Sequence, residues 1–488
     1  MSQPLTWAAL LDSNALRERV LLQYVYSYFE SRGGKFDEIC FFGLQYFVKR
    51  YLCGPVVTQE KIDEAADIVS YHLGPDHFNR AGWEHIVKAH GGRLPVAIKS
   101  VPEGTVVPTK NVLFTMVNTD PKCYWLTNYL ETLLVQVRTL TSGLSPHFHS
   151  LQGTIFHHGL RSRAQKKLIK SFIEKTGGDE AALVGANLML HDFGYRGVSS
   201  VESAATGGAA HLVNFWGTDT MAAIICIKHY YGGGVVPLIP GQDPLPVPGV
   251  SIPAAEHSTI TSWGREGELD AYRNMLTQYP TGLVAVVSDS YDVFNACKNF
   301  WGKELKELIV NRQGRLVVRP DSGDPPVIVL LEILGEAFAE HCTKTSTGYR
   351  VLPPFIRLIQ GDGVSYETLG AIMQAMMDAN WAAENLAFGS GGALLQKLNR
   401  DTQKCAFKCS EITKSDGSTV NVYKDPITDK GKQSKMGRLT LEKNAEGVLV
   451  TTVEGKGDPA KDELIEVFRD GVLLVEQKFE DIRACAKC

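Results

Sequence analysis

The sequence predicts an α/β protein whose central part is a barrel of parallel strands and helices. Between about residues 185 and 400, short apolar runs end in polar, glycine-containing residues, and a helical segment follows each run. Strands that alternate with helices predict a parallel sheet, and unbroken apolar runs predict strands that are buried on both faces. Five or more such units favour a barrel.

Five apolar runs and their spacing support this prediction. The runs are His211–Phe215, Leu283–Val287, Leu316–Val318, Ile356–Ile359 and Leu386–Phe388. The polar positions that follow the last four runs are 32, 41 and 28 residues apart, and they are Asp289, Asp321, Asp362 and Ser390. Each interval has the length of one strand, one loop and one helix, so each run is expected to begin a new unit.

The two ends of the chain differ from the central part. Residues 1–180 and 401–488 are expected to form one α+β domain together, and residues 181–400 are expected to form the barrel that carries the active site. Their patterns predict strands at Tyr24–Phe29, Val420–Tyr423, Arg438–Leu441 and Val448–Thr452, and helices at Ile39–Tyr51 and Tyr124–Gln136. Residues 138–163 are rich in Ser, Gly, His and Arg, residues 232–249 are rich in Pro and Gly, and both segments predict loops.

The charge and the cysteines exclude several classes of function. The chain has 50 basic and 54 acidic residues, a net charge of -4, which gives no electrostatic case for nucleic-acid or membrane binding. No basic segment precedes an apolar stretch at the N-terminus and no run of about 18 apolar residues exists, so neither a signal peptide nor a transmembrane helix is predicted. Ten scattered cysteines indicate reduced thiols in a cytoplasmic protein.

No metal-binding motif stands out in the sequence. The first predicted loop contains four histidines with no Cys or carboxylate between them, which favours surface histidines over metal ligands. They are His147, His149, His157 and His158. Cys485 and Cys488 form a single Cys-x-x-Cys pair, whereas a structural zinc site needs four ligands. We therefore expect no metal site made by the protein alone.

Charged residues gather where the predicted strands end. The acidic ones are Asp219, Asp289, Asp321 and Asp362, and the basic ones are Arg196, His257 and Arg319. Ligands bind at the carboxyl ends of parallel strands. One Asp after a strand is more often a helix N-cap, but four of them with two arginines favour a binding site. Carboxylates bind Mg²⁺ or ribose hydroxyls and arginines clamp phosphate oxygens, so the mixture suits a polyphosphorylated sugar.

A glycine-rich loop enters a helix at Gly389–Ala393. Glycine lets the backbone approach a ligand, and a helix N-terminus offers free N–H groups to a phosphate. The loop lacks the Gly-Lys-Ser/Thr of a Walker A motif and the spacing of a dinucleotide-binding motif, so we expect a monophosphate site. His257 has Glu256, Ser258 and Thr259 as possible partners, and these do not decide between a structural and a functional role.

Seven motifs, in order along the chain, resemble the nicotinamide phosphoribosyltransferase family (type II phosphoribosyltransferases, NAPRTase family). They are Asp192–Val198, Gly217–Asp219, Pro253–Thr259, Ser288–Asp292, Arg319–Gly323, Gln360–Gly363 and Phe388–Gly392. The resemblance runs from Tyr26–Glu30 to beyond Lys456, and it implies an irregular α/β barrel plus a domain built from both chain ends. It also implies a homodimer with both active sites at the interface.

The resemblance implies an enzyme that transfers phosphoribosyl from 5-phosphoribosyl 1-diphosphate to nicotinamide, giving nicotinamide mononucleotide and diphosphate in NAD salvage. Phe193 would stack on the pyridine ring, and Asp219 would accept a hydrogen bond from the carboxamide. An anionic Asp219 would repel nicotinate and so select the amide. The transition state would be oxocarbenium-like, so positioning and electrostatics would supply most of the rate.

The resemblance assigns further positions to the phosphorylated sugar. Catalytic roles go to His257, Asp289 and Asp321. Arg196, Arg319 and His257 would hold the diphosphate, and Asp321, Gly361 and Asp362 would face the ribose. The implied positions at the 5′-phosphate are Gly391, Gly392, Arg400 and Lys408, and Ser251 is a further implied substrate-binding position. Mg²⁺ would neutralise the leaving diphosphate, and ATP would be a facultative co-substrate that phosphorylates His257.

Two other functions stay open. The first is a nicotinate phosphoribosyltransferase of the same fold, against which Asp219 argues. The second is a catalytically weak binding or signalling protein of the same fold, which rests on two departures from the family. Asp12–Ser13 are followed by Asn14–Ala15 where the family has Tyr-Lys, and Val137–Arg163 replaces a shorter segment.

Overall fold

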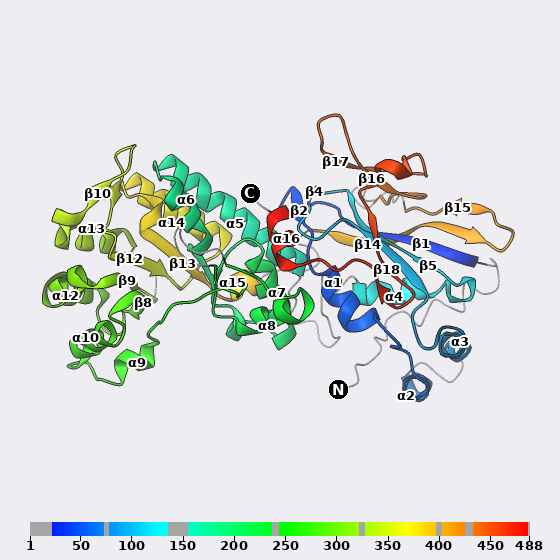
Figure 1. Cartoon of the computed structure of the whole chain (residues 1–488), viewed down its shortest axis with the longest axis horizontal. Helices are drawn as coiled ribbons and strands as arrows, with labels where there is room; N and C mark the ends of the chain where they lie inside the picture. Colours follow the sequence, from blue (N-terminus) through cyan, green and yellow to red (C-terminus); the bar gives the residue numbers. More distant parts are fainter. Residues whose placement is uncertain are drawn as a thin grey trace. The chain divides into compact units, whose positions relative to one another are not determined.

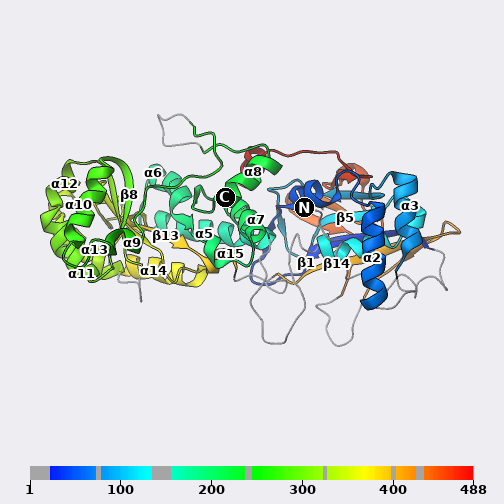
Figure 2. The same cartoon turned by 90° about the horizontal axis from the view of Figure 1, so that it is seen from below.

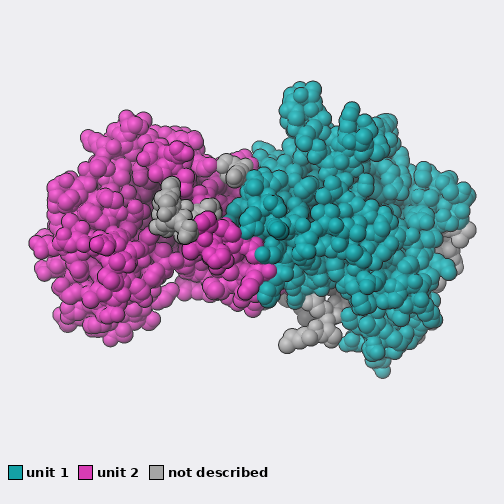
Figure 3. All heavy atoms as spheres, viewed as in Figure 1, with its two compact units in different colours: residues 1–160, 229–232, 398–487 teal, residues 161–228, 233–397, 488 magenta. Residues whose placement is uncertain are grey.

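The chain divides into two compact units, which Figure 3 colours separately. The computed structural model describes residues 22–72, 78–134, 155–236, 244–321, 327–396, 403–424 and 433–486. Unit 1 is built from Met1–Leu160, His229–Gly232 and Leu398–Lys487, and unit 2 from Arg161–Lys228 and Gly233–Lys397. The main boundaries thus fall at 160/161 and 397/398, whereas the sequence-based division placed them at 180/181 and 400/401.

Unit 2 is built around a six-stranded sheet whose paired strands are all parallel. In spatial order the strands are β7 (Gly217–Thr218), β6 (Leu190–Asp192), β13 (Leu386–Ser390), β12 (Ile356–Gln360), β9 (Gln313–Arg319) and β8 (Thr281–Val287). Four of the five predicted runs are therefore strands of this sheet. In Figure 1, helices flank β8, β9, β12 and β13.

The segment 250–255 connects the two edge strands of this sheet. The Thr218 N–H donates to the Val250 carbonyl at 3.0 Å beside β7, and the Ala255 N–H donates to the Ala285 carbonyl at 2.9 Å on β8. Isolated parallel bridges join the same segment to Gly217 and to Ala285. The segment thereby closes the sheet into an irregular barrel, which confirms the predicted fold class.

Both faces of the sheet carry buried side chains. Successive side chains of a strand point to opposite faces, so neighbouring residues of one strand pack in different clusters. Val284 and Val286 of β8 lie in the main core with the surrounding helices. Ala285, between them in sequence, packs instead with Val317 and Ile359, and Phe193 lies against this small cluster. The helices of unit 2 are α5 (Ile155–Lys175), α6 (Glu180–Gly185), α7 (Val201–Leu212), α8 (Met221–Tyr230), α9 (His257–Thr261), α10 (Glu268–Gln278), α11 (Val293–Asn295), α12 (Lys306–Asn311), α13 (Val327–Ala337), α14 (Tyr366–Asp378) and α15 (Gly392–Leu395).

Unit 1 contains a seven-stranded antiparallel sheet to which both chain ends contribute. β1 (Leu22–Ser31) pairs with β14 (Cys405–Lys414), and Figure 2 shows these two strands side by side. The other strands of this sheet are β15 (Thr419–Asn421), β5 (Val112–Asn118), β3 (Val96–Ser100), β18 (Ile465–Arg469) and β19 (Val472–Leu473). Two-stranded pairs add β2 (Glu38–Cys40) with β4 (Val106–Pro108) and β16 (Thr440–Lys443) with β17 (Leu449–Thr452).

Unit 1 also contains α-helices, of which the one after β5 packs against β1 and β5. They are α1 (Leu44–Phe47), α2 (Gln59–His72), α3 (Arg80–His90), α4 (Leu126–Leu134) and α16 (Phe479–Cys485). The predicted strand at Tyr24–Phe29 is confirmed. Of the predicted helix at Tyr124–Gln136, the structure shows helix over Leu126–Leu134, preceded by a turn at Tyr124 and Trp125. No helix in the described part of the chain is long and apolar enough to cross a membrane.

Three predicted elements are wrong. The run His211–Phe215 is not a strand: it is the end of α7 and the turn that follows, with the His211 and Phe215 rings stacked 5.1 Å apart. The segment Ile39–Tyr51 begins as the strand β2, and helix starts only at Leu44. The reason in both cases is that a short apolar run fits either structure, and pairing with other strands decides.

The third error concerns the predicted loop at 138–163. Residues 155–163 form the start of α5, while 138–154 lie outside the described residues. The sequence of this helix lacks a clear apolar period because polar side chains occupy its buried face. Ser162 Oγ lies 3.0 Å from Nδ1 of buried His211, and the Lys166 ammonium donates to the Asn214 carbonyl at 3.0 Å. In the second predicted loop, Val236 and Leu245 form one isolated bridge, and residues 237–243 lie outside the described residues.

Candidate active site

A cavity of about 660 Å³ opens at the carboxyl ends of the parallel strands of unit 2. Its volume is in the range that suits a small-molecule ligand. Loops that follow β6, β7, β9, β12 and β13 supply most of its lining. The lining residues that the sequence had singled out are Phe193, Arg196, Asp219, Arg319, Asp321, Gly361, Asp362, Gly391 and Gly392. Five of the seven charged residues predicted at the strand ends thus line one cavity, and they are Arg196, Asp219, Arg319, Asp321 and Asp362.

Phe193 provides an aromatic wall of this cavity directly after β6. Its backbone N–H donates to the Ser390 carbonyl at 3.0 Å, which ties the loop after β6 to the end of β13. A Cβ placed on Gly389 would overlap the Phe193 ring, so only glycine leaves room for this ring position. The His191 ring lies 5.0 Å from the Phe193 ring, measured between centroids.

Asp219 lies at the same end of the cavity, directly after β7. His191 Nε2 is 2.9 Å from Asp219 Oδ1, and the Ser251 hydroxyl donates to the same oxygen. The other oxygen, Oδ2, has no hydrogen-bond partner among the described residues, and 49 % of the side chain is exposed. Partial burial acts to raise the pKa of Asp219, but the hydrogen bond and charge of His191, the Ser251 hydroxyl and Arg319 lower it overall. Asp219 thus presents one open oxygen of an ionised carboxylate.

Asp192 supports the two loops that carry Phe193 and Asp219. It is fully buried at the end of β6, where Oδ1 accepts from the Gly194 N–H at 2.7 Å and Oδ2 accepts from the Thr218 hydroxyl at 3.3 Å. Burial raises the pKa of Asp192 to about 6, against these hydrogen bonds. Its carbonyl also accepts from the Asp219 N–H at 2.9 Å, so it connects both loops.

Arg319 is the most buried cation of the cavity, with 7 % of its side chain exposed. Its Nη2 is 3.3 Å from Asp321 Oδ2 and 3.7 Å from Glu256 Oε2. Its Nε is buried and has no partner in the described part of the chain. A guanidinium held by two carboxylates with a free donor can bind an anion such as phosphate.

His257 and Asp289 form a pair beside this arginine. His257 Nε2 is 3.2 Å from Asp289 Oδ1, and the Asp321 N–H donates to Asp289 Oδ2 at 2.9 Å. Asp289 is nearly buried, whereas 41 % of the His257 side chain is exposed. Asp289 therefore holds both the imidazole and the backbone of the loop after β9. All three predicted catalytic residues lie together here.

The glycine-rich loop after β13 lines the opposite part of the cavity wall, with Gly391 and Gly392 at its surface. A Cβ on Gly197 would meet the Gly392 Cα at 3.2 Å, so the loops after β6 and β13 approach closely. The buried Arg161 guanidinium of α5 donates to the Ala393 carbonyl and holds this loop from behind. Opposite, Gln360 Nε2 donates to the Asp362 carbonyl at 3.0 Å, which fixes the loop after β12.

Among the predicted site residues of unit 2, His257, Asp289 and Ser251 do not themselves line this cavity. Lys408 lies on β14 of unit 1, where its ammonium donates to the Phe407 carbonyl at 2.7 Å and is 3.5 Å from Glu131 Oε1. Arg400 lies outside the described residues, as do Ser322 and Gly323 of the motif after β9. Ser251 does not line the cavity but contacts it through Asp219.

His191 is the site residue that the sequence reasoning missed. It lies within the strand β6, two residues before Phe193, and not in a loop after a strand. The available signal was alternation, because residues two apart in a strand share a face. Glu256 had been considered only as a partner of His257, whereas it contacts Arg319 and lines the cavity.

Comparison with known proteins identifies relatives along the whole chain. Residues 188–472 match the model of the nicotinate phosphoribosyltransferase (NAPRTase) family, and residues 19–98 match that of the nicotinamide phosphoribosyltransferase N-terminal domain. A nicotinamide phosphoribosyltransferase of Xanthomonas campestris pv. campestris is 45 % identical, covering 98 % of this chain and 97 % of the relative. One of Acinetobacter baylyi is 32 % identical, covering 94 % and 92 %.

A solved structure shares the fold at much lower sequence identity. The crystal structure of nicotinate-nucleotide pyrophosphorylase from Pyrococcus furiosus superposes with a TM-score of 0.55 and 13 % identity. The match covers 98 % of this chain and 92 % of the other. It supports the two-part α/β architecture described above.

Proposed function

Because this chain belongs to the nicotinate phosphoribosyltransferase (NAPRTase) family, we propose that it transfers phosphoribosyl from 5-phosphoribosyl 1-diphosphate to nicotinamide. The products are nicotinamide mononucleotide and diphosphate, and the reaction belongs to NAD salvage. The ring nitrogen of nicotinamide forms the new bond to the ribose C1, and the bond from C1 to the diphosphate oxygen breaks. The chain is thus a pentosyltransferase.

The observation that carries the choice of base is the open carboxylate of Asp219 beside Phe193. Nicotinamide has an N–H donor on its carboxamide, and Asp219 Oδ2 has no other partner among the described residues. Nicotinate has a carboxylate in the same place, which an ionised Asp219 repels. The lowered pKa of Asp219 keeps it ionised at neutral pH. These features favour a nicotinamide enzyme over a nicotinate enzyme of the same fold.

The charged loops supply the groups that the sugar donor needs. Arg319 and Arg196 line the cavity and would hold the diphosphate, while Asp321 and Asp362 would accept hydrogen bonds from the ribose hydroxyls. The glycine loop at Gly391 would receive the 5′-phosphate through its backbone N–H groups. In this arrangement the base and C1 are held together, and the departing charge is met by cations already in place.

Mg²⁺ fits this site as a partner of the diphosphate. Asp321 Oδ1 has no hydrogen-bond partner among the described residues, and Mg²⁺ prefers carboxylate and phosphate oxygens. Asp321 would therefore hold the ion together with the substrate, and the ion would neutralise charge that develops on the leaving diphosphate. We propose no further protein ligand for it.

His257 is suited to accept a phosphoryl group from ATP. If Nε2–H donates to Asp289, Nδ1 keeps its lone pair, and the partly exposed ring leaves this nitrogen open to a phosphoryl donor. Nδ1 would then attack the terminal phosphorus of ATP, so that a nitrogen–phosphorus bond forms and ADP leaves. Hydrolysis of this phosphohistidine would favour product formation.

We further propose that the enzyme is a cytoplasmic homodimer whose active sites lie at the interface. Several exposed apolar side chains on the helices that follow β6 and β7 support such an interface. They are Tyr195, Val201, Met221 and Ile225. The cysteines in the described part of the chain are free thiols, as a reducing compartment maintains. Light scattering at micromolar concentration should give the mass of two chains.

The experiment that tests the function is diphosphate release by the purified full chain with nicotinamide, 5-phosphoribosyl 1-diphosphate and Mg²⁺. We expect diphosphate and nicotinamide mononucleotide in equal amounts. A well-folded dimer that binds nicotinamide but releases no diphosphate would show instead a binding or signalling protein of this fold.

A further inference from the structure

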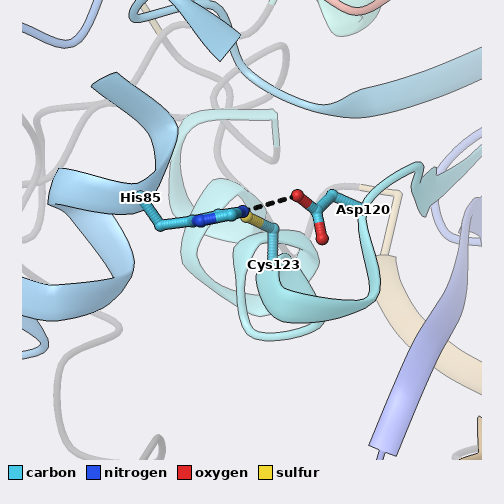
Figure 4. Close-up of side chains that lie close together, drawn as sticks. All are labelled: His85, Asp120 and Cys123. Carbon is cyan, nitrogen blue, oxygen red and sulfur yellow. Dashed lines mark hydrogen bonds and ion pairs between the residues drawn. The ribbon is translucent and has the colours of Figure 1, made fainter. Parts of the chain in front are cut away.

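Four side chains that commonly bind metals converge in unit 1, outside the lining of the cavity. His85 and His90 belong to α3, Asp120 follows β5, and Cys123 ends the short 3-10 helix Pro121–Cys123. Figure 4 shows His85, Asp120 and Cys123 facing one another. None of these residues takes part in the proposed reaction.

The distances show how closely the side chains converge. His85 Nε2 and His90 Nε2 each lie 2.7 Å from the same oxygen, Asp120 Oδ2. One ligand atom each of His85, Asp120 and Cys123 lies within 4.8 Å of the others. Ligand atoms bound to one tetrahedral zinc ion lie roughly 3–4 Å apart, given bonds of about 2.0–2.3 Å. Small side-chain rotations therefore suffice to place all three on one ion.

The backbone that carries these side chains is fixed on both sides. Trp83 of α3 is buried, and its ring lies 4.7 Å from the Trp125 ring and 4.8 Å from the Tyr129 ring. Asp120 caps the 3-10 helix by accepting from the Lys122 N–H at 2.8 Å, and its carbonyl accepts from Asn118 Nδ2 at 2.8 Å. The ligands thus come from two elements whose relative position is set by aromatic packing, as a preorganised site requires.

We propose that His85, Asp120 and Cys123 bind a divalent transition-metal ion of the zinc type. Imidazole, carboxylate and thiolate together suit zinc, whereas Mg²⁺ prefers oxygen ligands alone. His90 holds the Asp120 carboxylate in place, in the way that outer hydrogen bonds orient metal ligands. Water occupies the fourth position of the tetrahedron.

The site has a path for the ion and a balanced binding step. About a quarter of each imidazole side chain is exposed, 24 % for His85 and 26 % for His90, while Cys123 is buried at the base. The ion enters from the imidazole side and forms a bond to Cys123 Sγ. The S–H bond breaks, and its proton passes to water.

Cobalt is the probe for this site, because it takes the place of zinc and reports on a sulfur ligand by colour. The full chain is treated with a chelator, dialysed and titrated with Co²⁺. We expect one ion per chain and a thiolate-to-cobalt charge-transfer band in the near ultraviolet, which an equivalent of Zn²⁺ removes. Because no turnover is measured, the outcome is independent of the proposed activity.

Three variants locate the ion. Cys123→Ser should abolish the band, and His85→Asn should weaken Co²⁺ binding at least about tenfold. Cys485→Ser is the matched control, because this exposed thiol near the chain end lies outside the cluster and its loss should leave the band unchanged.

Several results would overturn the proposal. They are no charge-transfer band with the unchanged chain, a band retained in Cys123→Ser, or a band lost in Cys485→Ser. Cys123 is fully buried, so its variant is at risk of misfolding. In that case the test is the variant of partly exposed His85. Co²⁺ binding unchanged in a folded His85→Asn protein would show that His85 and His90 only form hydrogen bonds with Asp120.

Discussion

Replacing Asp219 by Asn should convert a nicotinamide-selective site into one that accepts both bases. Asn keeps the shape of the side chain but removes its charge. Nicotinamide loses a charge-assisted hydrogen bond, worth about 1.5–3 kcal/mol. Since 49 % of the side chain is exposed, we take the lower end, which corresponds to about a tenfold loss of kcat/KM.

Nicotinate should gain from the same substitution. Two unit charges about 4 Å apart repel by about 4 kcal/mol at an effective dielectric constant of about 20, and solvent at this exposed position reduces the effect. A gain of about tenfold in kcat/KM for nicotinate is therefore expected, and the ratio of the two bases should change about 100-fold.

The assay measures kcat/KM for each base at saturating 5-phosphoribosyl 1-diphosphate, with product identified by chromatography. Ser251→Ala is the control, because it removes a hydrogen bond to Asp219 Oδ1 without changing the charge. Its ratio should change less than about fivefold. A ratio that is unchanged in a folded Asp219→Asn enzyme would refute the role we assign to this carboxylate.

Three further predictions concern the walls and the support of the site. Gly389→Ala should displace the Phe193 ring and raise the KM for nicotinamide about tenfold, measured by steady-state kinetics. Because burial raises the folded-state pKa of Asp192 to about 6, ionisation costs stability as pH rises from about 4 to about 6. We compare the free energy of unfolding in urea of Asp192→Asn with that of the unchanged protein at two pH values. The difference in favour of the variant should be larger at pH 7.5 than at pH 4, by up to about 3 kcal/mol. His257→Ala should abolish a phosphohistidine formed with ATP, measured by mass spectrometry. The control is His341→Ala, at a similarly exposed histidine that lies beside Glu340 and outside the cavity lining, and this variant should retain the phosphohistidine.

Each of these predictions has a result that contradicts it. Gly185→Ala is the control for the first, because a Cβ there meets nothing within 4 Å, and an equal rise in KM would exclude the ring as the cause. A stability difference that does not vary with pH would show that Asp192 is not the titrating group. A phosphohistidine that survives in His257→Ala would place the modification on another histidine.

The strands of the barrel were predictable where both of their faces are buried. Leu283–Val287 is an unbroken apolar run, and Ile356–Ile359 is interrupted only by Arg357. Such runs mark parallel strands covered on both sides. β7 was not predictable, because its two residues, Gly217–Thr218, are held by neighbours and not by their own pattern. The start of α5 was not predictable from an apolar pattern, because its buried face carries polar side chains that contact Asn214 and His211.

The site was predictable at the strand ends and not elsewhere. Asp219, Asp321 and Asp362 each follow a strand, and the carboxyl ends of parallel strands meet at one edge. His191 lies inside a strand, so only the structure shows that it contacts Asp219. The cluster around Asp120 combines two segments of the chain whose spacing matches no metal-binding motif, and only the packing of α3 brings them together.

A competition between the two bases tests the central claim most directly. The full chain receives equal concentrations of nicotinamide and nicotinate with a limiting amount of 5-phosphoribosyl 1-diphosphate and Mg²⁺, and both mononucleotides are quantified. The open, ionised Asp219 predicts nicotinamide mononucleotide in at least about tenfold excess. Nicotinate mononucleotide in equal or greater amount, or neither product from a folded enzyme, would contradict the account.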